Sequence, residues 1–143
     1  MRTVEPVGPI RRLRPHNKNL RLMNAIEIAF TVYPVMDLKR ARQFYEGVLG
    51  LRLARHFGDD EKGMIEYDIG PGTLAIGAGV SRFKPSQGGG CAAIEYDDFE
   101  AVIRRLRENG CDFQTEPTET PVCHIAVISD PDGNSLMVHK RKG

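Results

Sequence analysis

Apolar and polar residues alternate in two separate stretches of the chain, and each stretch is followed by an apolar repeat of helical spacing. The alternating stretches are 26–32 and 91–96, and the helical repeats are 38–48 and 99–106. Alternation with a period of two indicates a strand with one buried face, whereas a period of 3.6 indicates an amphipathic helix. Each half of the chain is therefore predicted to begin with a strand followed by a helix.

Both predicted helices are flanked by residues that favour helix ends. Asp37 and Asp98 stand directly before the helical repeats, where an aspartate side chain accepts hydrogen bonds from the free N–H groups of the first turn. Gly50 and Gly110 stand just after the repeats, and glycine readily adopts the left-handed conformation that ends many helices. These signals predict helices over about 37–49 and 98–109.

The landmarks recur at an internal spacing of about 61 residues, which indicates two copies of one structural unit. Asp37 matches Asp98, and the stretch 68–74 matches 130–136. Three short strand candidates follow each helix, and a turn rich in Asp, Gly and Asn precedes the last strand of the second copy. We therefore predict an α+β fold of two tandem βαβββ modules that form a cup-shaped mixed sheet with the helices outside. The modules are about 25–79 and 91–140, joined by a glycine-rich crossover at 80–90.

Length and charge define the domain and its N-terminal segment. The chain has 143 residues, which suits one domain. Its net charge is only +1, but residues 1–23 carry six arginine and lysine residues and one glutamate. Prolines interrupt this segment and no aromatic residues accompany its charges, so we expect an extension without ordered structure and no nucleic-acid partner. The domain is expected to span 24–143, and translation could start at Met1 or at Met23.

Cysteine usage and hydropathy bear on the compartment. The three cysteines have no metal-type spacing and suggest no disulfide framework. No apolar run is long enough for a membrane helix, and no secretory signal is recognisable. We therefore expect a cytoplasmic protein with no membrane partner.

The order of the elements and their motifs resembles a known superfamily. Residues 42–51 read Arg-Gln-Phe-Tyr-Glu-Gly-Val-Leu-Gly-Leu, 95–100 read Glu-Tyr-Asp-Asp-Phe-Glu, and 130–134 read Asp-Pro-Asp-Gly-Asn. Over about 24–140 the chain is similar to the glyoxalase/bleomycin-resistance/extradiol-dioxygenase (vicinal-oxygen-chelate) superfamily. The resemblance implies paired βαβββ units around a cup and a homodimer. Modules could pair within one chain or be exchanged between two.

The same resemblance implies four metal-ligand positions, which most family enzymes fill with His, Gln or Glu on the first and last strands of each module. In this sequence the positions are Ala29, Ala75, Cys91 and Met137. Phe30 takes the place of Ala29 if the strand carries no bulge at Tyr33–Pro34. Alanine has no donor atom, and the Met thioether suits copper(I) rather than harder divalent ions. We therefore expect no bound metal and no other cofactor.

Alternation along the strands selects the residues that face into the cup. It places Thr31 and Tyr33 there from module one, and Glu95 and His139 from module two. Cys123 alternates inward with apolar residues, whereas His124 faces the helix side. The ligand-binding candidates are Thr31, Tyr33, Cys91, Glu95, Cys123, Met137 and His139.

These observations indicate a protein that binds a small, partly apolar molecule in the cup or processes it without a metal. They leave open whether a reaction is catalysed, and they identify no catalytic residue. One alternative is a metal-dependent lyase or dioxygenase with other ligands, for which the sequence offers Glu66, Glu95, His124 and His139. A second alternative is a structural or sensory module whose cup is filled by side chains.

Overall fold

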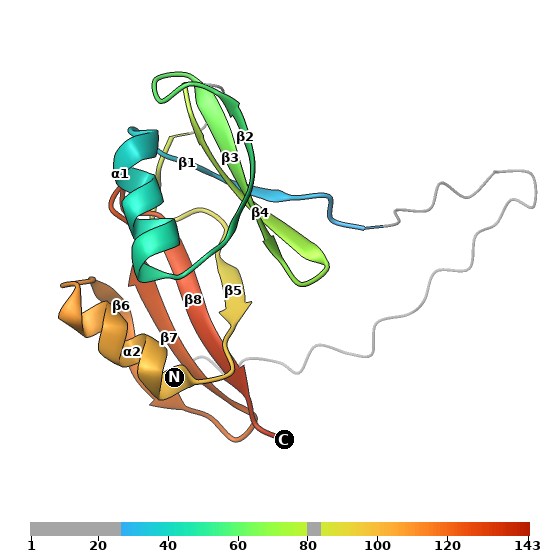
Figure 1. Cartoon of the computed structure of the whole chain (residues 1–143). Helices are drawn as coiled ribbons and strands as arrows, with labels where there is room; N and C mark the ends of the chain where they lie inside the picture. The colour runs from blue at the N-terminus through green and yellow to red at the C-terminus, as the bar shows by residue number, and fades with distance from the viewer. Residues whose placement is uncertain (1–26, 80–83) are drawn as a thin grey trace, which may run out of the picture.

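The chain runs twice through the same order of elements, as Figure 1 shows. The computed structural model describes residues 27–79 and 84–143, so the extension predicted over 1–23 lies outside the described residues. The first copy contains β1 (Thr31–Pro34), α1 (Leu38–Arg42), the π-helix η1 (Gln43–Val48), β2 (Leu53–Gly58), β3 (Gly63–Ile69) and β4 (Gly72–Ala78). The second contains β5 (Ala92–Glu95), α2 (Phe99–Glu108), β6 (Phe113–Glu119), β7 (Cys123–Ser129) and β8 (Ser135–Arg141).

Each copy folds into a four-stranded mixed sheet with one topology. The strand orders are β1-β4-β3-β2 and β5-β8-β7-β6. The first strand of each module pairs in parallel with the last, and the other neighbours are antiparallel. Figure 1 shows α1 beside the first sheet and α2 beside the second. The predicted α+β fold of two tandem βαβββ modules is confirmed.

The helix ends form as the sequence predicts. Asp37 Oδ1 accepts a hydrogen bond from the Arg40 backbone N–H at 3.2 Å, and Asp98 Oδ1 accepts one from the Ala101 N–H at 3.0 Å. Gly50 and Gly110 have φ values of 71° and 66°. L-residues with a Cβ rarely adopt such values, so glycine is favoured at both positions.

One apolar core joins the two modules. Tyr45 and Tyr67 stack in module one with ring centroids 6.1 Å apart, and the fully buried Leu106 and Ile128 belong to the same cluster in module two. This core lies on the helix side of the sheets, and we call the opposite side of each sheet its open face. By contrast, every residue of β2 is exposed. Among the described residues, no helix is long and apolar enough to cross a membrane.

The turn at 130–134 fastens module two to module one, and we call it the junction turn. Asp130 Oδ2 accepts a hydrogen bond from the Tyr45 hydroxyl at 2.9 Å, and Asn134 Nδ2 donates to the Pro34 carbonyl at 2.8 Å. Burial, reinforced by the Asp130 carboxylate, raises the pKa of Tyr45 well above its ordinary value. Tyr45 therefore stays protonated and remains a hydrogen-bond donor to Asp130.

Candidate functional site

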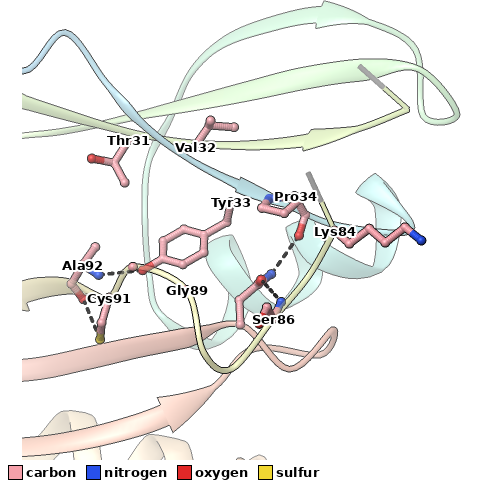
Figure 2. Close-up of a pocket in the computed structure, with 11 residues that line it drawn as sticks. Thr31, Val32, Tyr33, Pro34, Lys84, Ser86, Gly89, Cys91 and Ala92 are labelled. Carbon is pink, nitrogen blue, oxygen red and sulfur yellow. Dashed lines mark hydrogen bonds between the residues drawn. The ribbon is translucent and has the colours of Figure 1, made fainter. Parts of the chain in front are cut away.

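A cavity of about 500 Å³ lies where β1 meets the segment 84–92, and we call it the junction pocket. Figure 2 shows it, with Tyr33 reaching from β1 toward Ala92. Apolar side chains and backbone atoms form most of its lining, which includes Val32, Gly90 and Asn134. The pocket also brings together three of the ligand-binding candidates predicted from the sequence, which are Thr31, Tyr33 and Cys91.

The hydroxyl of Tyr33 connects the two modules. It donates a hydrogen bond to the Ser135 carbonyl at 2.8 Å and accepts one from the Ala92 N–H at 2.6 Å. Tyr33 is only 6% exposed, and burial raises the pKa of its hydroxyl. The side chain therefore stays neutral and forms one wall of the pocket. Its hydroxyl hydrogen and one lone pair of its oxygen are already engaged in hydrogen bonds.

Thr31 and Tyr33 lie on the other side of β1 from the one that alternation predicted. Their partners across the parallel pair with β4 are Leu74 and Ile76, which belong to the apolar core. The prediction that Thr31 and Tyr33 face the cup is therefore wrong, because these positions share the helix side of the sheet. Both still line the junction pocket, since β1 is an edge strand there.

The register of β1 also corrects the first metal-ligand position. Val32 pairs with Ala75, and the pairing of β1 with β4 continues through Pro34 without a shift. No bulge interrupts the strand, so a two-residue period places Phe30, rather than Ala29, on the Ala75 side. Phe30 is 45% exposed and carries no donor atom. The expected position at Ala29 is wrong, and its replacement is equally unable to bind a metal.

Module two has the facing that alternation predicts. In the parallel pair of β5 with β8, Ala93 lies across from Met137 and Glu95 lies across from His139. The intervening Ile94 is buried in the core on the helix side. Glu95, Met137 and His139 therefore share the open face of module two.

Two neighbours on β7 point to opposite sides of this sheet. Cys123 is buried, and its Sγ lies 3.1 Å from the Thr120 hydroxyl oxygen at the end of the strand. His124 packs on the helix side, with its ring centroid 5.6 Å from that of Phe99 at the start of α2. His124 therefore lies on the helix side of the sheet, as the sequence indicates.

Cys91 carries a thiol rather than a thiolate at neutral pH. Burial raises the pKa of its thiol above the ordinary value. Its Sγ lies 3.9 Å from the Ala92 carbonyl oxygen. A neutral thiol is a poor nucleophile and a poor metal ligand, so Cys91 contributes a small apolar surface to the junction pocket.

Glu95 and His139 form the one close pair among the predicted candidates. His139 Nδ1 lies 2.5 Å from Glu95 Oε2, and Glu95 Oε1 accepts a hydrogen bond from the Arg141 backbone N–H at 2.7 Å. The Arg141 N–H, followed by His139, lowers the pKa of the Glu95 carboxyl. Glu95 is therefore a carboxylate over the whole neutral range.

The donor chemistry of these residues does not suit the metal that the family implies. The four family positions hold Phe30, Ala75, Cys91 and Met137. Among residues 27–79 and 84–143, no three His, Cys, Asp or Glu side chains come together as a metal site. The alternative ligand set is also not assembled within the chain, because His124 faces α2 and Glu66 is paired with Arg55.

Sequence reasoning missed an ion-pair cluster on the open face of module one. Arg55 on β2 bridges two acidic residues of β3, contacting Glu66 and placing its guanidinium 2.8 Å from Asp68. These contacts lower the pKa of the Asp68 carboxyl. The two-residue spacing of Glu66 and Asp68 was the available signal, but Arg55 could be assigned to them only from the register of β2 with β3.

Comparison with known proteins supports the fold and the family. The model of the Glyoxalase/Bleomycin resistance protein/Dioxygenase superfamily matches residues 27–138. A lactoylglutathione lyase of Haemophilus influenzae is 30% identical, over 78% of this chain and 90% of that protein. The corresponding protein of Escherichia coli O157:H7 is 27% identical, over 82% and 94%.

Two solved structures show the same arrangement. TnmS3, an antibiotic binding protein from Streptomyces sp. CB03234, superposes with a TM-score of 0.70 at 24% identity, over 84% of this chain and 99% of that one. A glyoxalase/bleomycin resistance protein from the same organism gives 0.65 at 25% identity, over 78% and 98%. With the matched family model spanning nearly all the described residues, the chain belongs to the Glyoxalase/Bleomycin resistance protein/Dioxygenase superfamily.

Proposed function

We propose that the protein binds a small, partly apolar molecule at the junction of its modules, and that it does so without a metal. The observation that carries this proposal is the junction pocket, whose volume of about 500 Å³ lies in the range of small-molecule sites. Its mostly apolar lining favours an apolar ligand. The description of TnmS3 as an antibiotic binding protein supports the same class of ligand.

Adding bulk to the wall of the junction pocket should weaken binding. A Cβ at Gly90 would meet no atom within 4 Å, and Gly90 lines the pocket, so Gly90→Leu adds a bulky side chain at the pocket wall without a backbone clash. With N-phenyl-1-naphthylamine as an uncharged fluorescent probe, we expect saturable binding to the native chain and at least about tenfold weaker binding to Gly90→Leu.

Gly88→Leu is the matched control for this experiment. Gly88 lies in the same segment but does not line the pocket, and a Cβ there would meet only the Ser86 hydroxyl oxygen at 3.7 Å. This variant should bind the probe as the native chain does. Equal probe affinity in all three proteins would contradict the proposed site.

A metal-dependent lyase is the second candidate, because relatives with 27–30% identity are lactoylglutathione lyases. Elemental analysis of the purified protein separates the two candidates, as does an assay of lactoylglutathione lyase activity with added Zn²⁺, Ni²⁺ or Mn²⁺. We expect no stoichiometric metal and no metal-dependent turnover, because Phe30, Ala75 and Met137 offer no hard donor.

We also propose that two copies of the chain pair through the open face of module one. Phe57 lies on that face across from Met64, and it is 50% exposed. Phe30 is exposed beside the same sheet, and every residue of the edge strand β2 is exposed among the parts of the chain that the structure describes. Exposed apolar groups beside an unpaired strand edge are typical of an interface.

Light scattering at micromolar concentration should therefore give twice the 16.0 kDa mass of one chain. Phe57→Asp should shift the protein toward that single-chain mass, because pairing would bury the new carboxylate without a partner. Met36→Asp is the control, since Met36 is 72% exposed outside the sheets. A native protein of 16.0 kDa would rule out the pairing.

A further inference from the structure

The Glu95–His139 pair is held in place by the backbone of module two. The two residues are direct partners in the parallel pairing of β5 with β8, so their side chains leave the same face of the sheet side by side. His139 Nδ1 and Glu95 Oε2 lie 2.5 Å apart. The pair therefore follows from strand register and does not depend on a flexible loop.

Glu95 determines which imidazole nitrogen is available. One carboxylate oxygen is bound to the backbone N–H of Arg141, and the other accepts from His139 Nδ1. A carboxylate in this position favours the tautomer that carries hydrogen on Nδ1 and leaves a lone pair on Nε2. Among the described residues, Nε2 of His139 has no hydrogen-bond partner. The pair thus presents one oriented acceptor on the open face.

Apolar residues of β7 and β8 lie beside this acceptor, and Arg141 follows His139 on the same face of β8. On β7, Ile125 lies directly across from His139, and Val127 lies across from Met137 one step along the same face. The His139 side chain is 21% exposed, so it remains reachable. Beside the pair, Glu95 lines a second cavity of about 500 Å³ between the modules.

This second cavity offers room for the apolar part of a ligand. Ile69 and Leu74 of module one line it opposite Ala93. Thr31 lines both this cavity and the junction pocket, so the two hollows border on each other at β1. Glu95 and Arg141 line the polar end of this cavity. His139 lies next to Glu95 outside the lining, so a ligand bonded to Nε2 has to reach past Glu95.

From this arrangement we propose that His139 Nε2 accepts a hydrogen bond from an acidic hydroxyl group, of the phenol or enol type, on a partly apolar ligand, with Glu95 as the positioning residue. The inference deepens the proposed function and rests on it. A lone pair on Nε2 offers no hydrogen to an anionic ligand, even though Arg141 lies beside Glu95 in the lining of the second cavity. Both oxygens of the Glu95 carboxylate already accept hydrogen bonds, so they have few free positions for a cationic ligand. A hydroxyl donor complements the free Nε2, and any charge developing on the imidazole is balanced by Glu95.

A pair of probes that differ only in the hydroxyl group tests the inference. We expect 2-naphthol, which stays un-ionised at neutral pH, to bind about tenfold more tightly than 2-methoxynaphthalene, in which a methyl ether removes the donor. In His139→Phe the preference should disappear, leaving the two probes with similar affinity. His124→Phe is the control, because His124 packs on the helix side, and this variant should keep the preference.

The role of Glu95 has a readout independent of binding. In the native protein, imidazole ¹⁵N chemical shifts should report hydrogen on Nδ1 of His139, and Glu95→Gln should move the signals toward a mixture of tautomers. Unchanged shifts in Glu95→Gln would show that Glu95 does not set the tautomer of His139. Far-ultraviolet circular dichroism verifies that each variant is folded.

Equal affinity of the two probes for the native protein would overturn the inference, as would a preference that survives in His139→Phe. Failure of both probes to bind at millimolar concentration would overturn it as well. None of these results bears on the junction pocket, which is judged by the naphthylamine probe and Gly90→Leu. Failure of that experiment, with hydroxyl-selective binding intact, would instead remove the junction pocket and leave the Glu95–His139 site standing.

Discussion

Asp130→Ala is expected to lower the free energy of unfolding by about 3–5 kcal/mol, the largest effect among the substitutions considered. Asp130 is 4% exposed, and its carboxylate accepts four hydrogen bonds. Oδ1 binds the backbone N–H groups of Asp132 at 2.9 Å and Asn134 at 2.8 Å, and Oδ2 binds the Tyr45 hydroxyl at 2.9 Å and Asn134 Nδ2 at 2.8 Å. Alanine would leave these donors buried without acceptors, and each such group is costly.

Urea unfolding monitored by circular dichroism measures this loss. Asp112→Ala is the matched control, since Asp112 is an exposed aspartate just before β6, and its removal should change the free energy of unfolding by less than about 0.5 kcal/mol. Tyr45→Phe should reproduce part of the loss, because it removes one of the four donors and keeps the ring. A loss below about 1 kcal/mol for Asp130→Ala would show that the junction turn does not hold the modules together.

Leu106→Ala is expected to destabilise the protein by about 2–5 kcal/mol, which is the usual cost of removing a fully buried leucine side chain. Leu106 is 0% exposed and is the only buried residue that α2 contributes to the shared core. Its loss would leave a cavity under a helix whose remaining apolar residues are only partly buried. Thermal unfolding followed at several urea concentrations would give the change.

Arg104→Ala is the control for the same helix. Arg104 is exposed, and alanine is at least as good a helix former, so stability should stay within about 0.5 kcal/mol of the native value. If Leu106→Ala were as mild as Arg104→Ala, α2 would not be anchored by its core contact. The comparison therefore separates the packing of α2 from its intrinsic tendency to form a helix.

Local signals along the chain predicted the helices and the repeat. A capping aspartate and a terminal glycine act within one turn, so Asp37, Asp98, Gly50 and Gly110 could be interpreted without knowing any distant contact. The strand pattern of module two was equally informative. Ile94 is a large apolar residue and its neighbours on either side are not. Only the face of β5 that carries Ile94 could therefore be the buried one.

The facing of β1 could not be predicted in the same way. Phe30, Val32, Tyr33 and Val35 are all apolar or aromatic, so either face of this strand could have been the buried one. The choice depends on pairing with β4, more than 40 positions away, which places Tyr33 beside Ile76. A shift of one residue exchanges the two faces of a strand, and that is why Ala29 was expected where Phe30 belongs.

The sequence by itself determined the two βαβββ modules, their helix ends, the strand facing of module two and the absence of hard donors at most of the family's metal positions. These features arise from local periodicity and residue chemistry. Only the tertiary structure decided that Tyr33 bonds to Ser135 across the modules, that a pocket forms against Gly90, and that Glu95 and His139 meet. Such contacts join residues tens of positions apart, and their geometry depends on strand register and module packing, which no short stretch of sequence encodes.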